Sequence, residues 1–297
     1  MTERVLTRRE LNRALLARQL LLDRRPAPAP KVVERLGGLQ AQHSSSPYLS
    51  LHARIHGFER SELTTALERR RVVRARLQRG TLHIVAPRDY WAFTAGRAAL
   101  GRAQGQEQVV HVPPSGTWGY HGEGVYAAAD AVLPGSLPDP TVAREHLVRS
   151  HLRAFGPATA YDVAQWAGLP RTGGITDTLA SMPLRTFRDE QGNTLYDLPR
   201  APLPDAQTPA PPRLVPRYDN LVLSHAERAR VFGDVPISRI VTNNALVHAT
   251  ILVDGFVAGT WNLDKGRVRL DPFARLPRAT LKALEDEAER IEAFVAD

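Results

Sequence analysis

Apolar positions recur with a helical period at the start of the chain. The stripe from Leu11 to Leu22 falls on one helix face, and Thr7 with Glu10 makes a capping box in front of it. We expect a helix from residue 7 to about 23, ended by the proline-rich break at 26–30. Shorter apolar stripes predict further helices at 31–36, 49–55 and 59–69.

Two hairpins follow groups of predicted helices. The β-rich runs 72–78 and 81–85 are separated by Arg79-Gly80, which predicts a hairpin after the first group. Helices followed by a two-stranded hairpin are typical of the winged helix, a helix-turn-helix variant. The same order recurs, with helices at 141–154, 159–167 and 175–181 before a hairpin of 184–188 and 194–198.

The last third of the chain has a different pattern. Seven of the 18 residues in 199–216 are proline, which predicts an extended linker rather than a packed element. A hairpin signal around Asp254-Gly255 and a strand at 267–270 predict a small antiparallel β-barrel or sheet, closed by an acidic helix from about 278 to 295. The predicted fold is therefore α+β, with winged-helix domains at 1–104 and 105–198, the linker, and a C-terminal domain at 217–297.

Composition restricts the possible classes of protein. No stretch of the 297 residues approaches the roughly 18 uninterrupted apolar residues of a membrane span. The N-terminal segment is charged throughout and does not resemble a signal peptide, so we expect a cytosolic protein. The absence of cysteine excludes disulfides, thiolate metal sites and a cysteine nucleophile.

The charge is unevenly distributed. The net charge is +8, and residues 1–104 hold 20 basic and 8 acidic side chains. A basic lobe is typical of a polyanion binder, although a merely solvated basic surface has the same composition. Alternation on the strand 72–78 places two arginines on one face and apolar side chains on the other. The candidate DNA contacts are Arg69, Arg70, Arg71, Arg74, Arg76 and Arg79.

Most catalytic motifs are absent. The chain has no phosphate-binding GxxxxGK[ST], GxGxxG, HExxH or GxSxG motif, and no third ligand accompanies His52 and His56, so we expect neither a metal nor a cofactor. Gln40 and Gln42 follow Gly37-Gly38, and in an extended segment both amides point to one side. Taken alone, a QxQ tripeptide is far more typical of a polar loop than of a catalytic site.

The resemblance of longer segments adds to this interpretation. The runs LTRRELNRALLARQLLL, GLQAQHSSSPYLSLHARI, RGTLHIVAPRDYW, VPPSGTWG, FGPATAYDVAQWAGL, PRYDNLVLSHAERARV and VDGFVAGTW occur in this order. Together they resemble the bacterial winged-helix family that includes the AlkZ-type DNA glycosylases. The resemblance implies a C-shaped set of tandem winged helices with a C-terminal β-barrel, and DNA bound in the concave channel. It also implies catalysis by a Gln-apolar-Gln motif, here Gln40, Ala41 and Gln42, where the YcaQ type has aspartate at the second position.

The chain departs from the family pattern at two places. Only 103–112 fills the gap before VPPSGTWG, which predicts a short form that lacks much of the middle winged helix. His43 stands where relatives often carry an acid.

The run PRYDNLVLSHAERARV supplies further candidate pocket residues, for which capping and loop hydrogen bonding are an equal alternative. The candidate pocket residues are His43, Asp219, Asn220, His225 and Arg228.

Two glutamines suit a limited chemistry. An N7-alkylated guanine is cationic and its glycosidic bond is weak, so hydrolysis requires mainly a positioned water. The three lysines lie outside any motif, which favours monofunctional hydrolysis over a Schiff-base lyase. The sequence therefore predicts a monofunctional glycosylase that acts on N-alkylated or cross-linked purines in double-stranded DNA. The alternative is a non-catalytic winged-helix DNA-binding protein with a regulatory or architectural role.

Overall fold

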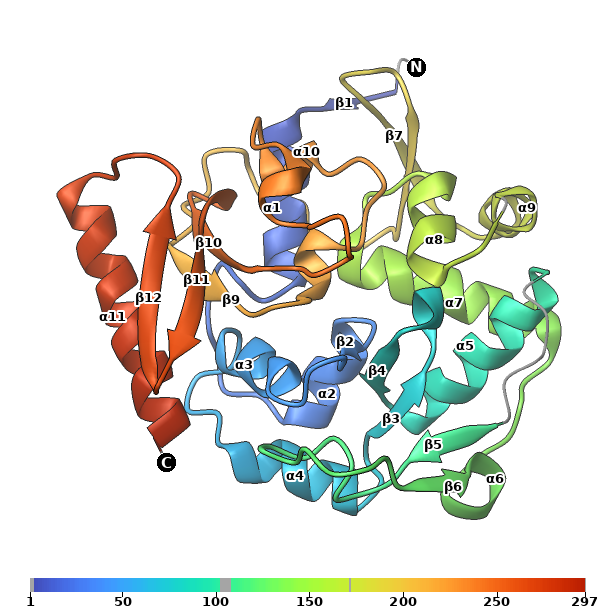
Figure 1. The fold of residues 1–297 in the computed structure, drawn as a ribbon. Helices are drawn as coiled ribbons and strands as arrows, with labels where there is room; N and C mark the ends of the chain where they lie inside the picture. The colour runs from blue at the N-terminus through green and yellow to red at the C-terminus, as the bar shows by residue number, and fades with distance from the viewer. Residues whose placement is uncertain (1–2, 102–107, 171, 297) are drawn as a thin grey trace.

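The computed structural model describes residues 3–101, 108–170 and 172–296. Helices and sheets are mixed, which confirms the α+β class (Figure 1). The described strands form three open sheets, and none of them closes into a barrel. In the described part of the chain, no helix combines the length and the apolar run needed to cross a membrane.

The N-terminal helices begin where their caps predict. Helix α1 (Arg8–Arg18) has the capping box of Thr7 and Glu10. It ends five residues before the predicted end, because Leu20 takes a positive φ of 57° that a helix cannot contain. The other predicted helices of this region are confirmed as α2 (Ala29–Arg35), α3 (Ser46–His52) and α4 (Arg60–Glu68).

A five-stranded sheet carries the glutamine segment. The predicted hairpin is confirmed as β3 (Val73–Arg76) and β4 (Leu82–Val85), with the 3-10 turn η1 (Gln78–Gly80) between them. Strand β2 (Leu39–Gln40) pairs with the outer side of β4. Strands β5 (Val109–His111) and β6 (Tyr126–Ala128), which the hydrophobic pattern did not predict, extend the sheet beyond β3.

A second group of helices packs beside this sheet (Figure 1). Helix α5 (Pro87–Ala99) lies along α7 (Pro140–Phe155), and the short α6 (Ala129–Val132) follows β6. Next come α8 (Ala160–Ala167), with the predicted cap Thr159, and α9 (Gly173–Ser181). The predicted hairpin is confirmed as β7 (Arg185–Asp189) and β8 (Thr194–Asp197), and β1 (Val5–Leu6) pairs with β7.

The C-terminal sheet is open and four-stranded. Its order is β12-β11-β10-β9, so of the two predicted forms the sheet is the one observed. The long helix α11 (Arg278–Ala296) covers it (Figure 1). The strands are β9 (Arg213–Val215), β10 (Ala249–Val253), β11 (Phe256–Asp264) and β12 (Arg267–Pro272). The short helices between β9 and β10 are η2 (Asn220–Val222), α10 (Ala229–Phe232) and η3 (Ile237–Arg239).

The proline-rich segment 199–216 is extended but packed. Its end forms β9, and arginines of α1 bind its carbonyl oxygens, so the prediction of an unpacked linker is wrong. Arg9 donates to Ala206 O at 2.8 Å and Arg13 to Thr208 O at 2.7 Å. Proline lacks an N–H but keeps its carbonyl, so a proline-rich segment is rich in acceptors that a guanidinium can satisfy.

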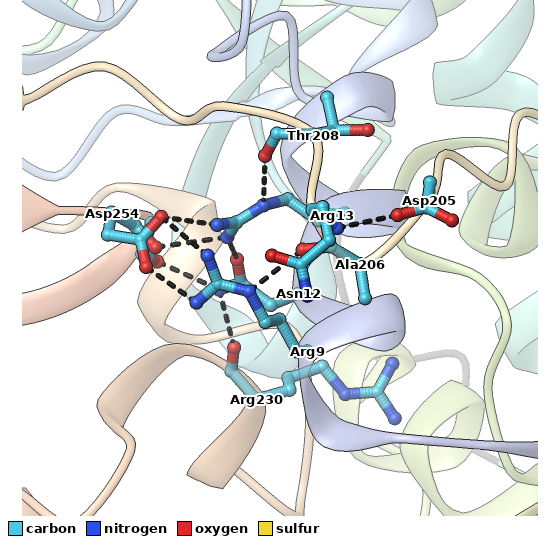
Figure 2. A network of polar contacts seen from close by, with 10 residues as sticks. Arg9, Asn12, Arg13, Asp205, Ala206, Thr208, Arg230 and Asp254 are labelled. Atoms are coloured by element: carbon cyan, nitrogen blue, oxygen red, sulfur yellow. Dashed lines mark hydrogen bonds and ion pairs between the residues drawn. The ribbon is translucent and has the colours of Figure 1, made fainter.

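The same helix binds the turn of the C-terminal hairpin. Arg9 and Arg13 both form ion pairs with Asp254 (Figure 2). Asn12 donates at 2.8 Å to Gly255 O. Arg13 is fully buried, and a buried cation is stable only when such partners compensate for its lost hydration. The N-terminal helix therefore fixes the C-terminal sheet and the proline-rich segment together.

The apolar core crosses the predicted domain boundaries. One cluster contains Leu15, Val73, Leu147 and Val215, and a second joins α2 to α4 with the C-terminal sheet and α11. The boundaries at 104 and 198 stay a prediction, because a shared core neither requires nor excludes them.

Gly38 sets the entry to β2 and gives a test of this packing. Its φ is +94°, and a Cβ there would lie 2.7 Å from Val85 Cγ1. We expect Gly38→Ala to lower the free energy of unfolding by about 2–4 kcal/mol, the sum of backbone strain and overpacking, in urea denaturation. Gly57→Ala is the control, because Gly57 has a φ of +68° but nothing within 4 Å of its Cβ position, and should cost about 1 kcal/mol. An equal loss of unfolding free energy in the two variants would show that the Val85 side chain can move aside at little cost.

Candidate functional site

Gln40 ends the strand β2 at the edge of the five-stranded sheet, and Gln42 follows it in a bend. Gln40 pairs with His83, and Ala41 N donates to Leu82 O at 2.7 Å. The extended pairing ends at Ala41, so the condition under which both glutamine side chains would share a direction is not met at Gln42. Their exposure also differs, because Gln40 is 7% exposed and Gln42 is open to solvent.

The amide of Gln40 is held by Arg79. Arg79 Nη2 donates to Gln40 Oε1 at 3.0 Å, and Arg79 Nη1 donates to Trp166 O at 3.2 Å. Burial, followed by the charge of Arg228, lowers the pKa of Arg79 to about 10, so it remains a cation at neutral pH. The cation orients the Gln40 amide by binding its carbonyl oxygen.

Gln42 faces a polar hollow of about 300 Å³. Its Oε1 accepts a hydrogen bond from Leu82 N at 3.2 Å. A carbonyl oxygen has two lone pairs, so this one can also accept from a water molecule in the hollow. Gln40 is not among the lining residues of this hollow. They are Gln42, His43, Ser44, Arg74, His111, Ser115, Gly116, Tyr120, His121, Gly122, Gly124 and Tyr126.

Arg74 holds the backbone between the two glutamines. Its Nε and Nη2 donate to Ala41 O at 3.3 and 3.1 Å. Its Nη1 lies 3.0 Å from His111 Nδ1 and 3.4 Å from Ser115 Oγ. Burial and the neighbouring arginine charges lower the pKa of His111 to about 4, so its ring is neutral at pH 7 and can accept from Arg74. Arg74 thus connects β3, β5 and the following loop to the glutamine strand.

The structure divides the six arginines that we expected to contact DNA. Arg69, Arg70, Arg71 and Arg76 are exposed. Arg74 and Arg79 instead bind Ala41 and Gln40. The alternation on β3 is as predicted, with Ala75 buried and Arg76 exposed. Alternation gives the face of a side chain but not what covers that face, and here β5 with its loop partly covers Arg74.

His43, one of the candidate pocket residues, lies at the polar hollow. It is exposed, and its Nδ1 lies 2.9 Å from Ser45 Oγ. Partial burial, then the charges of Arg217 and His121, lower its pKa. None of the lining residues between 111 and 126 was singled out from the sequence. The run VPPSGTWG belonged to the resemblance, but nothing in its pattern indicated that His111, Ser115 or Tyr120 would face Gln42.

The other four candidate pocket residues do not line this hollow. Asp219, Asn220 and His225 are buried, and Arg228 is partly buried. Asp219 pairs with Arg54 through two contacts of 2.7 and 2.8 Å and caps η2 through Leu221 N. Asn220 Nδ2 donates to Gly38 O at 2.7 Å, which fixes the turn before β2. His225 Nε2 lies 2.9 Å from Phe155 O, and Arg228 Nε donates to His225 O at 3.4 Å. These contacts match the alternative of capping and loop hydrogen bonding.

Two other predictions concern metals and the short middle region. Among the described residues, no group of three potential ligands could hold a metal ion. The ring of His52 packs at 4.5 Å from that of Phe294, and His56 is exposed. Of the segment 103–112, residues 103–107 lie outside the described part of the chain, and the rest leads into β5.

Comparison with known proteins gives three consistent matches. The model of a family described as DNA glycosylase AlkZ-like matches residues 33–108 and 91–294. An interstrand DNA cross-link repair glycosylase from Streptomyces sahachiroi is 26% identical over 171 residues. That match covers 53% of this chain and 44% of the relative, less than half of its length. The solved structure of the Streptomyces sahachiroi DNA glycosylase AlkZ superposes with a TM-score of 0.84 at 18% identity. It covers 98% of this chain and 97% of that chain, which shows that the fold is shared.

The Arg54–Asp219 pair supports the turn before β2 and can be tested by pH. Burial alone would raise the pKa of Asp219, but the charge of Arg54 and hydrogen bonds from Arg54, Leu221 N and Ser50 lower it overall. Asp219→Asn leaves Arg54, 1% exposed, without its counter-charge, and should cost about 3–5 kcal/mol of unfolding free energy at pH 7.

The pH dependence has a definite sign. A carboxyl whose folded pKa is lowered stabilises fully above its unfolded pKa of about 3.9, and this contribution is lost as the pH falls through the folded pKa. Urea denaturation at several pH values should therefore show the gap between wild type and Asp219→Asn closing in acid. Asp234→Asn is the control, because Asp234 is 97% exposed in its pair with Arg8 and should change little. A difference in unfolding free energy that stays constant from neutral to acidic pH would contradict an ionised Asp219.

Proposed function

The chain belongs to the AlkZ-like DNA glycosylase family, and on this basis we propose that it is a monofunctional DNA glycosylase. Its substrate is an N-alkylated purine in double-stranded DNA, including cross-linked DNA of the kind that the curated relative is named for. One observation carries the proposal. Gln40 lies on a paired strand, and Gln42, two residues further on, faces a polar hollow.

The reaction requires little acid or base catalysis. As the C1′–N9 bond breaks, its electron pair neutralises the cationic alkylated guanine, which therefore leaves without protonation. A water molecule forms the new bond to C1′ of the oxocarbenium ion and loses a proton to solvent. Gln42 Oε1 accepts a hydrogen bond from this water and orients its oxygen toward the sugar. An amide is neutral, so it stabilises the developing cation less than a carboxylate does, which limits the enzyme to labile lesions.

Arg74 and Arg79 are positioning residues in this proposal. Arg79 fixes the Gln40 amide, and Arg74 fixes the Ala41 carbonyl on the backbone that carries Gln42. A water-orienting group is effective only when its own position is fixed. Both arginines therefore act through the glutamines rather than on the substrate.

The DNA surface in this proposal combines two winged helices. The hairpin β3–β4 serves as the wing of the first and β7–β8 as the wing of the second, in the predicted domains 1–104 and 105–198. Arg76 on β3 and the exposed arginines that follow α4 contact phosphates. The alternative function is a DNA-binding protein in which the glutamines are structural, and excision by the wild-type protein separates the two.

Gln42 gives the direct test of catalysis. We expect Gln42→Ala to retain affinity for duplex DNA but to lose at least about 100-fold in single-turnover excision of N7-methylguanine, because only a transition-state interaction is removed. Gln42→Asp should remain active or improve, since a carboxylate both holds water and stabilises the oxocarbenium ion. The measurement is the yield of alkali-labile abasic sites with enzyme in excess.

Gln207→Ala is the matched control, because it removes an exposed amide far along the chain in the proline-rich segment. A parallel loss of affinity in Gln42→Ala would indicate a structural glutamine. Tight DNA binding by the wild type without excision of any cationic purine lesion would favour the alternative function.

Arg74 and Arg76 share a strand face but should give different phenotypes. Arg76→Ala should weaken binding on all sequences and reduce the slope of log K against log salt by about one charge. Arg74→Lys keeps the charge but cannot bind Ala41 O through two nitrogens, so the excision rate at saturation should fall while the salt slope is retained. Fluorescence anisotropy and single-turnover assays measure the two effects. An equal change of slope in both variants would make Arg74 a phosphate contact.

A further inference from the structure

A second hollow, of about 680 Å³, lies apart from the polar hollow at Gln42 and shares none of its lining residues. Basic side chains of α1, α2 and α7 meet there with the loop that follows β8. We call it the arginine hollow. It is lined by Arg18, Arg35, Arg149, Arg153, Leu198, Pro199, Arg200, Ala201 and Pro202.

The floor of the arginine hollow is apolar and fixed. It consists of the segment 198–202, whose side chains are mainly Leu198 and two prolines. Arg18, 1% exposed, donates at 3.0 Å to Pro202 O and at 2.8 Å to Leu152 O, and pairs with Asp197 at 2.6 Å. Arg18 thus anchors the floor, and its charge is paired with Asp197, which also pairs with Arg185 at 2.6 Å.

The rim carries charge that is not neutralised. Within the ranges that the structure describes, no carboxylate lies within 4.0 Å of the other four arginines of the hollow. The nearby Glu34 pairs with Lys31 at 3.4 Å and offers Arg153 only its backbone oxygen, at 2.8 Å. The Nε atom of Arg153 is buried without a partner.

Holding these cations together is unfavourable. Arg149 and Arg153 are four residues apart on α7, a spacing at which like charges destabilise a helix. Burial, followed by the charge of Arg153, lowers the pKa of Arg35. A bound anion would relieve both costs, because it supplies the missing counter-charge and an acceptor for the free N–H groups.

The shape and chemistry of the hollow restrict the ligand. Its volume is in the range of small-molecule sites rather than of a flat DNA surface, and guanidinium groups bind phosphate through paired N–H donors. An apolar floor beside such a rim suits a phosphate ester with a flat, weakly polar body. We propose that the arginine hollow binds a nucleotide, with the phosphate at Arg35 and Arg153 and the base or sugar on the 198–202 floor. This site does not depend on the proposed excision activity.

The test measures binding of deoxyguanosine monophosphate to the full chain by isothermal titration calorimetry at low salt. Deoxyguanosine without the phosphate should bind at least about tenfold more weakly, the factor expected for the loss of charge-assisted hydrogen bonds. The variant Arg35→Gln/Arg153→Gln should lose at least about tenfold in affinity for the monophosphate. Because Arg153 also connects α7 to Glu34 O, a second variant, Arg149→Gln/Arg200→Gln, removes two exposed rim charges and should also weaken binding.

The control Arg188→Gln/Arg267→Gln removes the same charge from two exposed ion pairs and should bind as the wild type does. Unchanged affinity in both rim variants, an equal loss in the control, or inorganic phosphate binding as tightly as the nucleotide would overturn the proposal. Competition separates two sources of the nucleotide. Displacement by a short 5′-phosphorylated single strand, but not by its 5′-hydroxyl form, assigns the site to a strand end, and displacement by neither assigns it to free nucleotide.

Discussion

The structure depends on buried guanidinium groups that bind distant backbone carbonyls. Arg13, Arg18 and Arg54 are among the largest fully buried side chains, and each pairs with a carboxylate and also donates to backbone oxygens. Burying a charge is costly unless it is paired and hydrogen-bonded. The planar, five-donor guanidinium can meet this condition with several acceptors at once, which a lysine ammonium cannot do in the same geometry. These contacts connect α1 to the proline-rich segment, to the second group of helices and to the C-terminal sheet.

The same interaction extends into the candidate site. Arg74 binds Ala41 O and Arg79 binds Gln40 Oε1, so the glutamine strand is held by two arginines at the edge of its sheet. On the other side, Asn220 binds Gly38 O, and Asp219 with Arg54 fixes the position of Asn220. The segment PRYDNLVLSHAERARV therefore supports the site from behind without lining the polar hollow.

What distinguishes the arginines is how many acceptors lie within reach of each guanidinium group. Arg18 and Arg79 are structural, because each of them binds at least two acceptors on distant segments. Arg76 is exposed and fits the proposed contact with DNA phosphates. The rim of the arginine hollow is a third class, because its charges are gathered in a concave place without counter-charge. The net charge counts all three classes of arginine alike and does not distinguish between them.

Local signals in the sequence determined the elements that need no distant partner. Thr7 and Thr159 predicted helix starts, and Arg79-Gly80 and Asp254-Gly255 predicted hairpins, because capping and turn formation involve residues only a few positions apart.

Only the tertiary structure decided the partners. Arg54 and Asp219 are separated by 165 residues, Arg74 and His111 by 37, and neither pair leaves a local pattern. The hydrophobic pattern placed Arg74 and Arg76 on one face of a strand but could not show that β5 and its loop cover one and not the other. For the same reason the proline-rich segment was predicted to be a free linker. Its composition does not show that two arginines of α1, almost 200 residues away, bind its carbonyl oxygens. A charged side chain takes its role from the groups that surround it in space, and these groups come from all parts of the chain.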